Sequence, residues 1–127
     1  MPIPRQLRVL VVDDHPDGAE ALAQLLALHG HDVRAVTTCA EALAAVSGEG
    51  GFAPDVVLTD VRLRDGDGFA LAAELCRVLP ARSVLIALTG LQDQEEKCLA
   101  AGFDHYVLKP ADPAALAAII AKCAGGK

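Results

Sequence analysis

Strand-like and helix-like segments alternate five times along about 120 residues, and this alternation restricts the possible folds more than any other feature of the sequence. The strand-like segments span residues 7–12, 31–36, 55–60, 83–89 and 104–108. The helix-like segments span residues 17–29, 38–46, 68–79, 93–101 and 112–123. Because parallel strands need a crossover connection, usually a helix, this order predicts an α/β fold with a parallel sheet and helices on both of its faces.

Local sequence signals support this division of the chain. The first, third and fourth strand-like segments are nearly continuous apolar runs, as expected for strands covered on both faces. Gly30 and Gly102 follow two of the helix-like segments, and Pro80 follows a third. Thr38 and Glu41 form a capping box that opens a helix.

The composition indicates a single domain with an aliphatic core. Of 127 residues, 53% are hydrophobic but only 3% are aromatic. We expect one domain over residues 1–127, with its core at about 7–123 and short tails. The four cysteines are widely spaced without a C-x-x-C pair, so we expect them to be reduced and to pack as small hydrophobic side chains.

Charge and hydropathy exclude several classes of function. A net charge of −6 without a cluster of Lys and Arg argues against direct binding of nucleic acid. No apolar run approaches the roughly 18 to 20 residues of a membrane span, and the opening MPIPRQ lacks the apolar stretch of a secretion signal. We therefore expect a soluble, cytoplasmic protein with no membrane insertion.

Polar residues gather where the strand-like segments end. Asp13 and Asp14 follow the first, Asp60 closes the third, Thr89 closes the fourth and Lys109 follows the fifth. Ligands of open α/β sheets bind at this carboxyl edge, where the strand order reverses. If the first and third strands are neighbours at that point, the three carboxylates converge. At about 5 Å each pair would repel by roughly 3 kcal/mol for an effective dielectric near 20, so the cluster would require a cation or protons. Oxygen donors of this kind suit Mg²⁺.

The set of residues Asp13–Asp14, Asp60, Thr89–Gly90 and Lys109–Pro110 resembles that of the receiver domains of two-component response regulators. The match in order and spacing covers about residues 7–123. The resemblance implies a flavodoxin-like, doubly wound (βα)5 three-layer sandwich, with a five-stranded parallel sheet in the order 2-1-3-4-5. It also implies that the protein is a phosphoacceptor signalling domain rather than an enzyme, apart from catalysing its own phosphorylation and dephosphorylation.

By the same resemblance, Asp60 accepts a phosphoryl group from a phosphohistidine on a histidine kinase or a histidine phosphotransfer protein. Asp14, the Asp60 carboxylate and the backbone carbonyl of Arg62 are implied to bind Mg²⁺, for which Mn²⁺ is a possible substitute. Asp13 is implied to act through metal-bound water. Lys109 is implied to pair with a phosphoryl oxygen.

The resemblance further implies a conformational switch. Thr89 bonds a phosphoryl oxygen and is drawn toward it, and Tyr106 on the last strand rotates inward behind it. The remodelled surface would act on a downstream effector or on a fused output or kinase domain. Lys109–Pro110 resembles the cis-proline turn of the family.

Some residues depart from the family pattern or have simpler interpretations. Many receivers have a proline where this chain has Arg64, which affects the rigidity of that loop. Arg62 is expected to project its side chain toward the site. His15 is expected to be a solvated turn residue, and Asp65–Gly68 is expected to form the turn into the third helix rather than a calcium loop.

Two alternative functions come from other classes. A degenerate receiver would bind proteins without phosphate, although all acceptor-site residues are present. A haloacid dehalogenase-type phosphatase needs a D-x-D pair, which Asp60-Val61-Arg62 does not supply. The segments 88–91 and 101–110 are similar to receivers of hybrid histidine kinases and lack the pattern of receivers joined to winged-helix DNA-binding domains. We therefore expect a hybrid-kinase or single-domain receiver.

Overall fold

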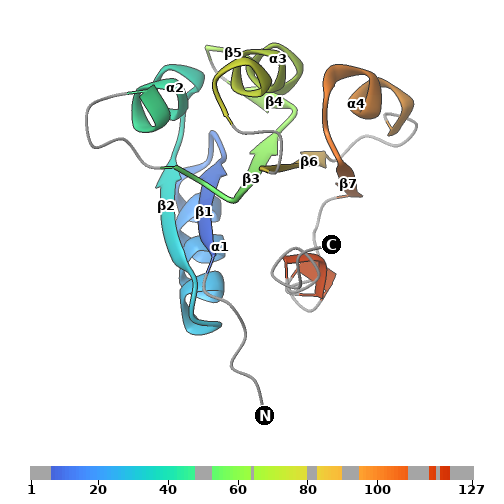
Figure 1. Cartoon of the computed structure of the whole chain (residues 1–127). Coiled ribbons are helices and arrows are strands. Elements are labelled where there is room, and N and C mark those ends of the chain that lie inside the picture. Colours follow the sequence, from blue (N-terminus) through green and yellow to red (C-terminus); the bar gives the residue numbers. More distant parts are fainter. Residues whose placement is uncertain are drawn as a thin grey trace.

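A five-stranded parallel sheet forms the centre of the protein (Figure 1). The computed structural model describes residues 7–47, 53–63, 65–79, 83–89, 95–108, 115–116 and 118–120. The strands of the sheet are β1 (Arg8–Val12), β2 (Asp32–Val36), β3 (Val56–Asp60), β6 (Val84–Thr89) and β7 (His105–Leu108). Their order is β2-β1-β3-β6-β7, which confirms the predicted order 2-1-3-4-5 of the main strands.

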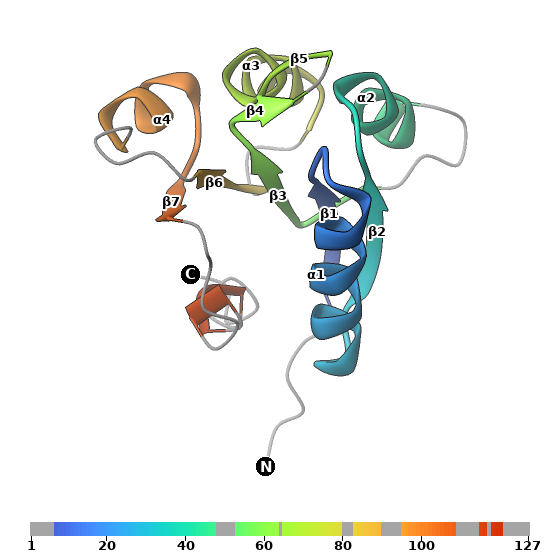
Figure 2. The ribbon, with the colours of Figure 1, turned by 180° about the vertical axis from the view of Figure 1, so that it is seen from behind.

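Helices cover both faces of this sheet (Figure 1, Figure 2). The helices α2 (Cys39–Ser47), α3 (Gly68–Val78) and α4 (Glu95–Ala101) lie on one face. On the other face lie α1 (Pro16–Leu28) and the helical residues 115–116 and 118–120. Most of the predicted last helix, and residues 93–94 of the fourth, lie outside the described residues. Among the described helices, none has the length and apolar character needed to cross a membrane.

Alternate strand residues supply two separate hydrophobic clusters, one for each face. In β1, Leu10 and Val12 join the cluster beneath α2, α3 and α4, whereas Val9 and Val11 join the cluster beneath α1. All four side chains are fully buried. Burying an aliphatic side chain of this size contributes about 1.5 to 3 kcal/mol, so the two clusters anchor β1 from both sides. The prediction of an aliphatic core with strands covered on both faces is confirmed.

The ends of the helices largely follow the predicted signals. Gly30 comes just after α1 with φ of 91°, a backbone conformation that glycine adopts without strain. The hydroxyl of Thr38 accepts a hydrogen bond from the Glu41 N–H at 3.0 Å, as a capping box requires. The Glu41 carboxylate reaches back one residue further than expected and accepts from the Thr37 N–H at 2.8 Å.

A short antiparallel strand pair follows the end of β3, and it was not predicted from the sequence. The strands β4 (Arg62–Leu63) and β5 (Gly66–Asp67) pair in this loop. The carboxylate of Asp67 then caps α3 by accepting a hydrogen bond from the Ala70 N–H at 2.7 Å. The loop therefore leads into the third helix as predicted, but it is a defined hairpin rather than a simple turn.

Candidate functional site: an acidic cluster at the carboxyl edge of the sheet

An acidic cluster lies where β1 and β3 end. In the register of these strands Val12 is opposite Thr59, so the chain leaves the two neighbouring strands through Asp13 and Asp60, side by side. One ligand atom each from Asp13, Asp14, His15 and Asp60 lies within 4.8 Å of all the others. The structure therefore brings together the three carboxylates that the sequence placed at this edge.

The carboxylates differ in burial. Asp13 and Asp60 are each 4% exposed, whereas Asp14 is partly exposed. At separations up to 4.8 Å, each pair of charges repels by about 3 kcal/mol for an effective dielectric near 20. Such repulsion is relieved by a bound cation, and carboxylate oxygens are hard donors suited to divalent cations. The cluster can therefore bind a metal ion, and its donor set fits the Mg²⁺ that the sequence predicts.

The turn after β1 holds the first carboxylate in place. The Asp13 N–H donates to the Val36 carbonyl at 3.1 Å, which continues the pairing of β1 with β2. The Asp13 carboxylate accepts from the His15 N–H at 2.9 Å. A Cβ added to Gly18 would lie 2.9 Å from the Asp13 carboxylate, so the glycine lets the first turn of α1 approach the cluster.

His15 is the one member of the cluster that sequence reasoning left out. Its side chain is exposed, as expected for a turn residue. Its Nδ1 atom nevertheless lies 3.0 Å from an oxygen of Asp14 and 3.5 Å from an oxygen of Asp13. A histidine directly after two clustered aspartates was the only signal available, and that signal does not distinguish a site residue from a solvated one.

Thr89 and Tyr106 lie near one another on the sheet. Thr89 ends β6, one position beyond Leu88, which is opposite Asp60 in the register, and it is 5% exposed. Tyr106 is half-buried in β7, opposite Ala87. Because Ala87 and Thr89 are two residues apart on one strand, their side chains and that of Tyr106 belong to the same face of the sheet. This placement is compatible with the predicted coupling of Thr89 to Tyr106.

Of the remaining predicted site residues, the structure describes only Arg62. Arg62 begins β4, two residues after Asp60, and its side chain is exposed. The role of its backbone carbonyl as a metal ligand remains a prediction. Lys109, Gly90, Pro110 and Arg64 lie outside the described residues.

The loop that follows Asp60 is tied to the start of α2. The Asp65 carboxylate accepts hydrogen bonds from the N–H groups of Cys39 at 2.9 Å and Ala40 at 3.1 Å. It thereby satisfies two of the donors that a helix leaves unpaired at its amino end. Burial and the adjacent Asp65 carboxylate raise the pKa of the Cys39 thiol to about 11, so this thiol stays neutral beside the loop. These two hydrogen bonds anchor the loop after β3 to a segment that is distant in the sequence.

Replacing Asp65 should destabilise the fold by an amount that depends on pH. The N–H groups of Cys39 and Ala40 hold the pKa of Asp65 below its ordinary value of 3.8. A depressed pKa stabilises the fold above the unfolded-state value, and the stabilisation is lost as the pH falls through the folded-state value. Asp65→Asn should therefore lower Tm by a few degrees at pH 7 and by less at pH 3, where part of the stabilisation is already lost. The measurement is thermal unfolding at both pH values, with Asp32→Asn as an exposed control. Equal effects of Asp65→Asn at both pH values would contradict the role of the charge.

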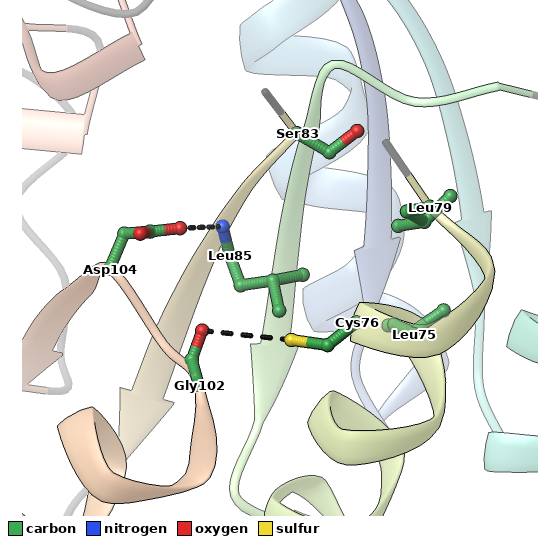
Figure 3. A pocket seen from close by; sticks show the side chains of 7 residues that line it. All are labelled: Leu75, Cys76, Leu79, Ser83, Leu85, Gly102 and Asp104. Atoms are coloured by element: carbon green, nitrogen blue, oxygen red, sulfur yellow. Dashed lines mark hydrogen bonds between the residues drawn. The ribbon is translucent and has the colours of Figure 1, made fainter. Parts of the chain in front are cut away.

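A separate pocket of about 280 Å³ lies at the other end of the sheet (Figure 3). It is lined by Leu75, Cys76, Leu79, Ser83, Leu85, Gly102 and Asp104. The Asp104 carboxylate accepts from the Leu85 N–H at 2.9 Å near the start of β6, whereas Thr89 ends that strand. The acidic cluster contributes no residue to this pocket. The candidate site is therefore the acidic cluster at the carboxyl edge of the sheet and not this pocket.

Residues 9–121 match the family model of the response regulator receiver domain. The chain belongs to this family. It is therefore a receiver domain of two-component signalling, a phosphoacceptor signalling module rather than a conventional enzyme. Kinases are the general class of partner for such domains.

Relatives of this receiver domain occur both as short proteins and inside much larger ones. The chain is 34% identical to a 14.6 kDa protein from the sodA1 3′ region of Leptolyngbya boryana, over 91% of this chain and 88% of that protein. It is 32% identical to hybrid signal transduction histidine kinase L of Dictyostelium discoideum, covering 91% of this chain but only 7% of the kinase. The receiver thus corresponds to a small part of the second relative.

A solved structure confirms the predicted fold. The CheY-like receiver domain protein from Methanospirillum hungatei superimposes with a TM-score of 0.84 at 28% identity, covering 96% of each chain. The flavodoxin-like arrangement that the sequence predicts is thus the arrangement of this family.

Proposed function

We propose that Asp60 is the phosphoacceptor of this receiver domain. The observation that supports the proposal is the buried Asp60 carboxylate at the end of β3, clustered with Asp13 and Asp14. Transfer to a carboxylate depends on in-line positioning and charge neutralisation more than on a strong general base. The buried strand end positions the Asp60 carboxylate, and a cation held by the two neighbouring carboxylates would supply the neutralisation.

In the proposed reaction, a carboxylate oxygen of Asp60 forms a bond to phosphorus. The bond between phosphorus and the imidazole nitrogen of a phosphohistidine breaks at the same time. The released imidazole takes up a proton, and Asp60 carries an acyl phosphate. No side chain of the receiver has to remove a proton from the nucleophile, because the carboxylate attacks in its ionised form.

Asp14, Asp60 and the backbone carbonyl of Arg62 are the groups that we propose to hold Mg²⁺, with Asp13 orienting water around the ion. Mn²⁺ has similar ligand preferences and is a possible substitute. The ion would supply charge neutralisation for the carboxylates and for the phosphoryl oxygens. The proximity of three carboxylates within 4.8 Å supports this assignment.

Lys109 and Thr89 complete the proposed acceptor site. We assign Lys109 to a phosphoryl oxygen and the Thr89 hydroxyl to another. Thr89 ends β6, one residue beyond Leu88, which pairs with Asp60 in the sheet. This position supports the role assigned to the Thr89 hydroxyl. Movement of Thr89 toward the phosphoryl group would free space on the face that it shares with Tyr106, and this is the proposed switch.

The proposed phosphodonor is a histidine kinase or a histidine phosphotransfer protein in the cytoplasm. The output would pass to an effector protein or to a fused output or kinase domain. The pattern of residues 88–91 and 101–110 is the basis for proposing a stand-alone receiver or one from a hybrid kinase, and similarity to a short protein and to a segment of a hybrid kinase is compatible with either origin. A single receiver domain over residues 1–127 is sufficient for the acceptor chemistry.

Intact-protein mass spectrometry after incubation with acetyl phosphate tests the acceptor. The wild-type protein should gain one phosphoryl group with Mg²⁺ and none with EDTA, whereas Asp60→Asn should gain none under either condition. Asp55→Asn changes the aspartate that directly precedes β3, at the opposite end of the strand from Asp60, and serves as the matched control. Uptake by Asp60→Asn would move the acceptor elsewhere. If the wild-type protein shows no uptake and beryllofluoride shifts no NMR signals, the domain is a phosphate-independent binding module.

A further inference from the structure

The imidazole of His15 occupies a distinctive place in the acidic cluster. The Nδ1 atom of His15 lies 3.0 Å from Asp14 Oδ1 and 3.5 Å from Asp13 Oδ1, although 75% of the side chain is exposed. His15 is also the N-cap residue of α1, yet its side chain makes no capping hydrogen bond. The side chain is thus directed to the carboxylates rather than to the end of the helix.

We propose that His15 is an additional metal ligand, which makes the site prefer transition-metal ions such as Ni²⁺ and Zn²⁺ over Mg²⁺. This inference rests on the proposed function, because it takes the cation site at Asp14 and Asp60 as given. It goes further by assigning the selectivity of that site to one residue. An acceptor site built from oxygen donors alone would have no imidazole to favour these ions.

The spacing of the ligand atoms agrees with this assignment. In an octahedral complex with bonds of about 2.1 Å, neighbouring ligands lie about 3.0 Å apart and opposite ligands about 4.2 Å apart. The separation of His15 Nδ1 from Asp14 Oδ1 is 3.0 Å, the value for neighbouring ligands. All four candidate ligand atoms lie within 4.8 Å of one another, so small side-chain movements are sufficient to enclose one ion.

The chemistry of the donors determines which ions benefit. Imidazole nitrogen is a good ligand for Ni²⁺, Cu²⁺ and Zn²⁺, whereas Mg²⁺ prefers oxygen and keeps much of its water. A nitrogen donor therefore adds affinity for the transition-metal ions and little for Mg²⁺. The three carboxylates contribute to the affinity for both kinds of ion.

The backbone at His15 is restricted before an ion arrives. The His15 N–H donates to Asp13 Oδ1 at 2.9 Å, and the following Pro16 restricts the chain at the start of α1. Less conformational freedom has to be lost when the ligand binds. The short D-D-H-P segment thus supplies two carboxylates and an imidazole from a single turn.

Metal titration of the tag-free protein, without a phosphodonor, tests the proposal. His15→Ala should weaken binding of Ni²⁺ by about tenfold or more and that of Mg²⁺ by less than about twofold. The variant loses no helix cap, because the His15 side chain makes none. His105→Ala removes an exposed histidine at the start of β7 and should change neither affinity. Excess Mg²⁺ should displace the Ni²⁺, since both ions would share Asp14 and Asp60.

Pulsed EPR of the Mn²⁺-loaded protein gives an independent readout. A hyperfine coupling from directly bound nitrogen should be present in the wild-type protein and in His105→Ala, and absent in His15→Ala. Equal weakening of Ni²⁺ and Mg²⁺ by His15→Ala, or absence of the nitrogen coupling from the wild-type protein, would overturn the proposal. If the metal selectivity is as expected but the protein takes up no phosphoryl group, only the acceptor role of Asp60 is contradicted. If neither ion binds, the inference fails, and phosphoryl uptake still tests Asp60 separately.

Discussion

Gly68→Ala should destabilise the domain by about 2 to 4 kcal/mol and reduce phosphoryl uptake at Asp60. Gly68 is buried at the start of α3, and its N–H donates to the Val61 carbonyl at 2.6 Å. An added Cβ would overlap the backbone carbonyl oxygen of Asp60 and lie 2.9 Å from Val61 Cα. These atoms belong to the backbone at the end of β3, so they cannot move aside as a flexible side chain would. Relief of the clash must displace the end of β3, the α3 helix or both.

Urea unfolding of Gly68→Ala measures the loss of stability, and mass spectrometry with acetyl phosphate measures the loss of uptake. Gly66→Ala is the matched control in the same loop, because its Cβ would make only an ordinary contact at 3.4 Å with the Cys39 sulfur. The control should stay within about 1 kcal/mol of the wild-type protein. Equal stability of the two variants would show that close approach of α3 to β3 does not constrain the acceptor.

Asp14→Asn should stabilise the metal-free protein by about 1 to 2 kcal/mol and remove most of the stabilisation by Mg²⁺. The change removes the repulsion of Asp14 by Asp13 and by Asp60. Each of these two repulsions contributes about 3 kcal/mol before screening by solvent. The Asp14 side chain is 23% exposed, so solvent reduces the gain. The same change removes a proposed Mg²⁺ ligand, and an ion that binds only the folded state stabilises in proportion to its affinity.

Urea unfolding with EDTA and with Mg²⁺ separates the two effects of Asp14→Asn. Asp17→Asn makes the same charge change at an exposed site in the first turn of α1 and is the matched control. It should slightly destabilise the protein, because a carboxylate near a helix amino end is favourable. If Asp14→Asn destabilises the metal-free protein, repulsion is not the dominant interaction of that carboxylate.

The fold was predictable because its signals are local. Continuous apolar runs identified the strands covered on both faces, and Gly30 and Gly102 marked the ends of two helices, both with positive φ in the structure. The resemblance supplied the strand order that makes β1 and β3 neighbours, and their parallel pairing then places Asp13 beside Asp60. The ends of the strands and the polar residues that follow them could therefore be predicted from the sequence. The expected convergence of the three carboxylates is confirmed.

Contacts between distant segments were not predictable in the same way. The hydrogen bonds from Cys39 and Ala40 to Asp65 join residues that are 26 and 25 positions apart, so no local pattern indicates them. The short strands β4 and β5 have only two residues each, too few for a periodic pattern. The contact of the His15 ring with Asp14 was not predicted, because an exposed histidine in a turn has no sequence feature that reveals the direction of its ring.

The hydrogen bonds that Asp65 accepts from the start of α2 are relevant to Arg64, the neighbouring residue that replaces a proline of many receivers. Many receivers have a proline there, which would restrict the loop by fixing its own backbone. In this chain the loop is restricted instead by pairing of β4 with β5 and by the bonds from Asp65 to the start of α2. A loop held by contacts can be released by breaking them, whereas a loop held by a proline ring cannot.

The edge position of β2 has a consequence for the behaviour of the protein at high concentration. Within the described residues β2 pairs with β1 alone, so its outer side carries backbone groups that another strand could pair with. Exposed Asp32 and Arg34 alternate along this strand, and charged side chains on an edge disfavour the addition of a neighbouring strand. The same strand that closes the sheet on this side therefore protects the protein against edge-to-edge aggregation.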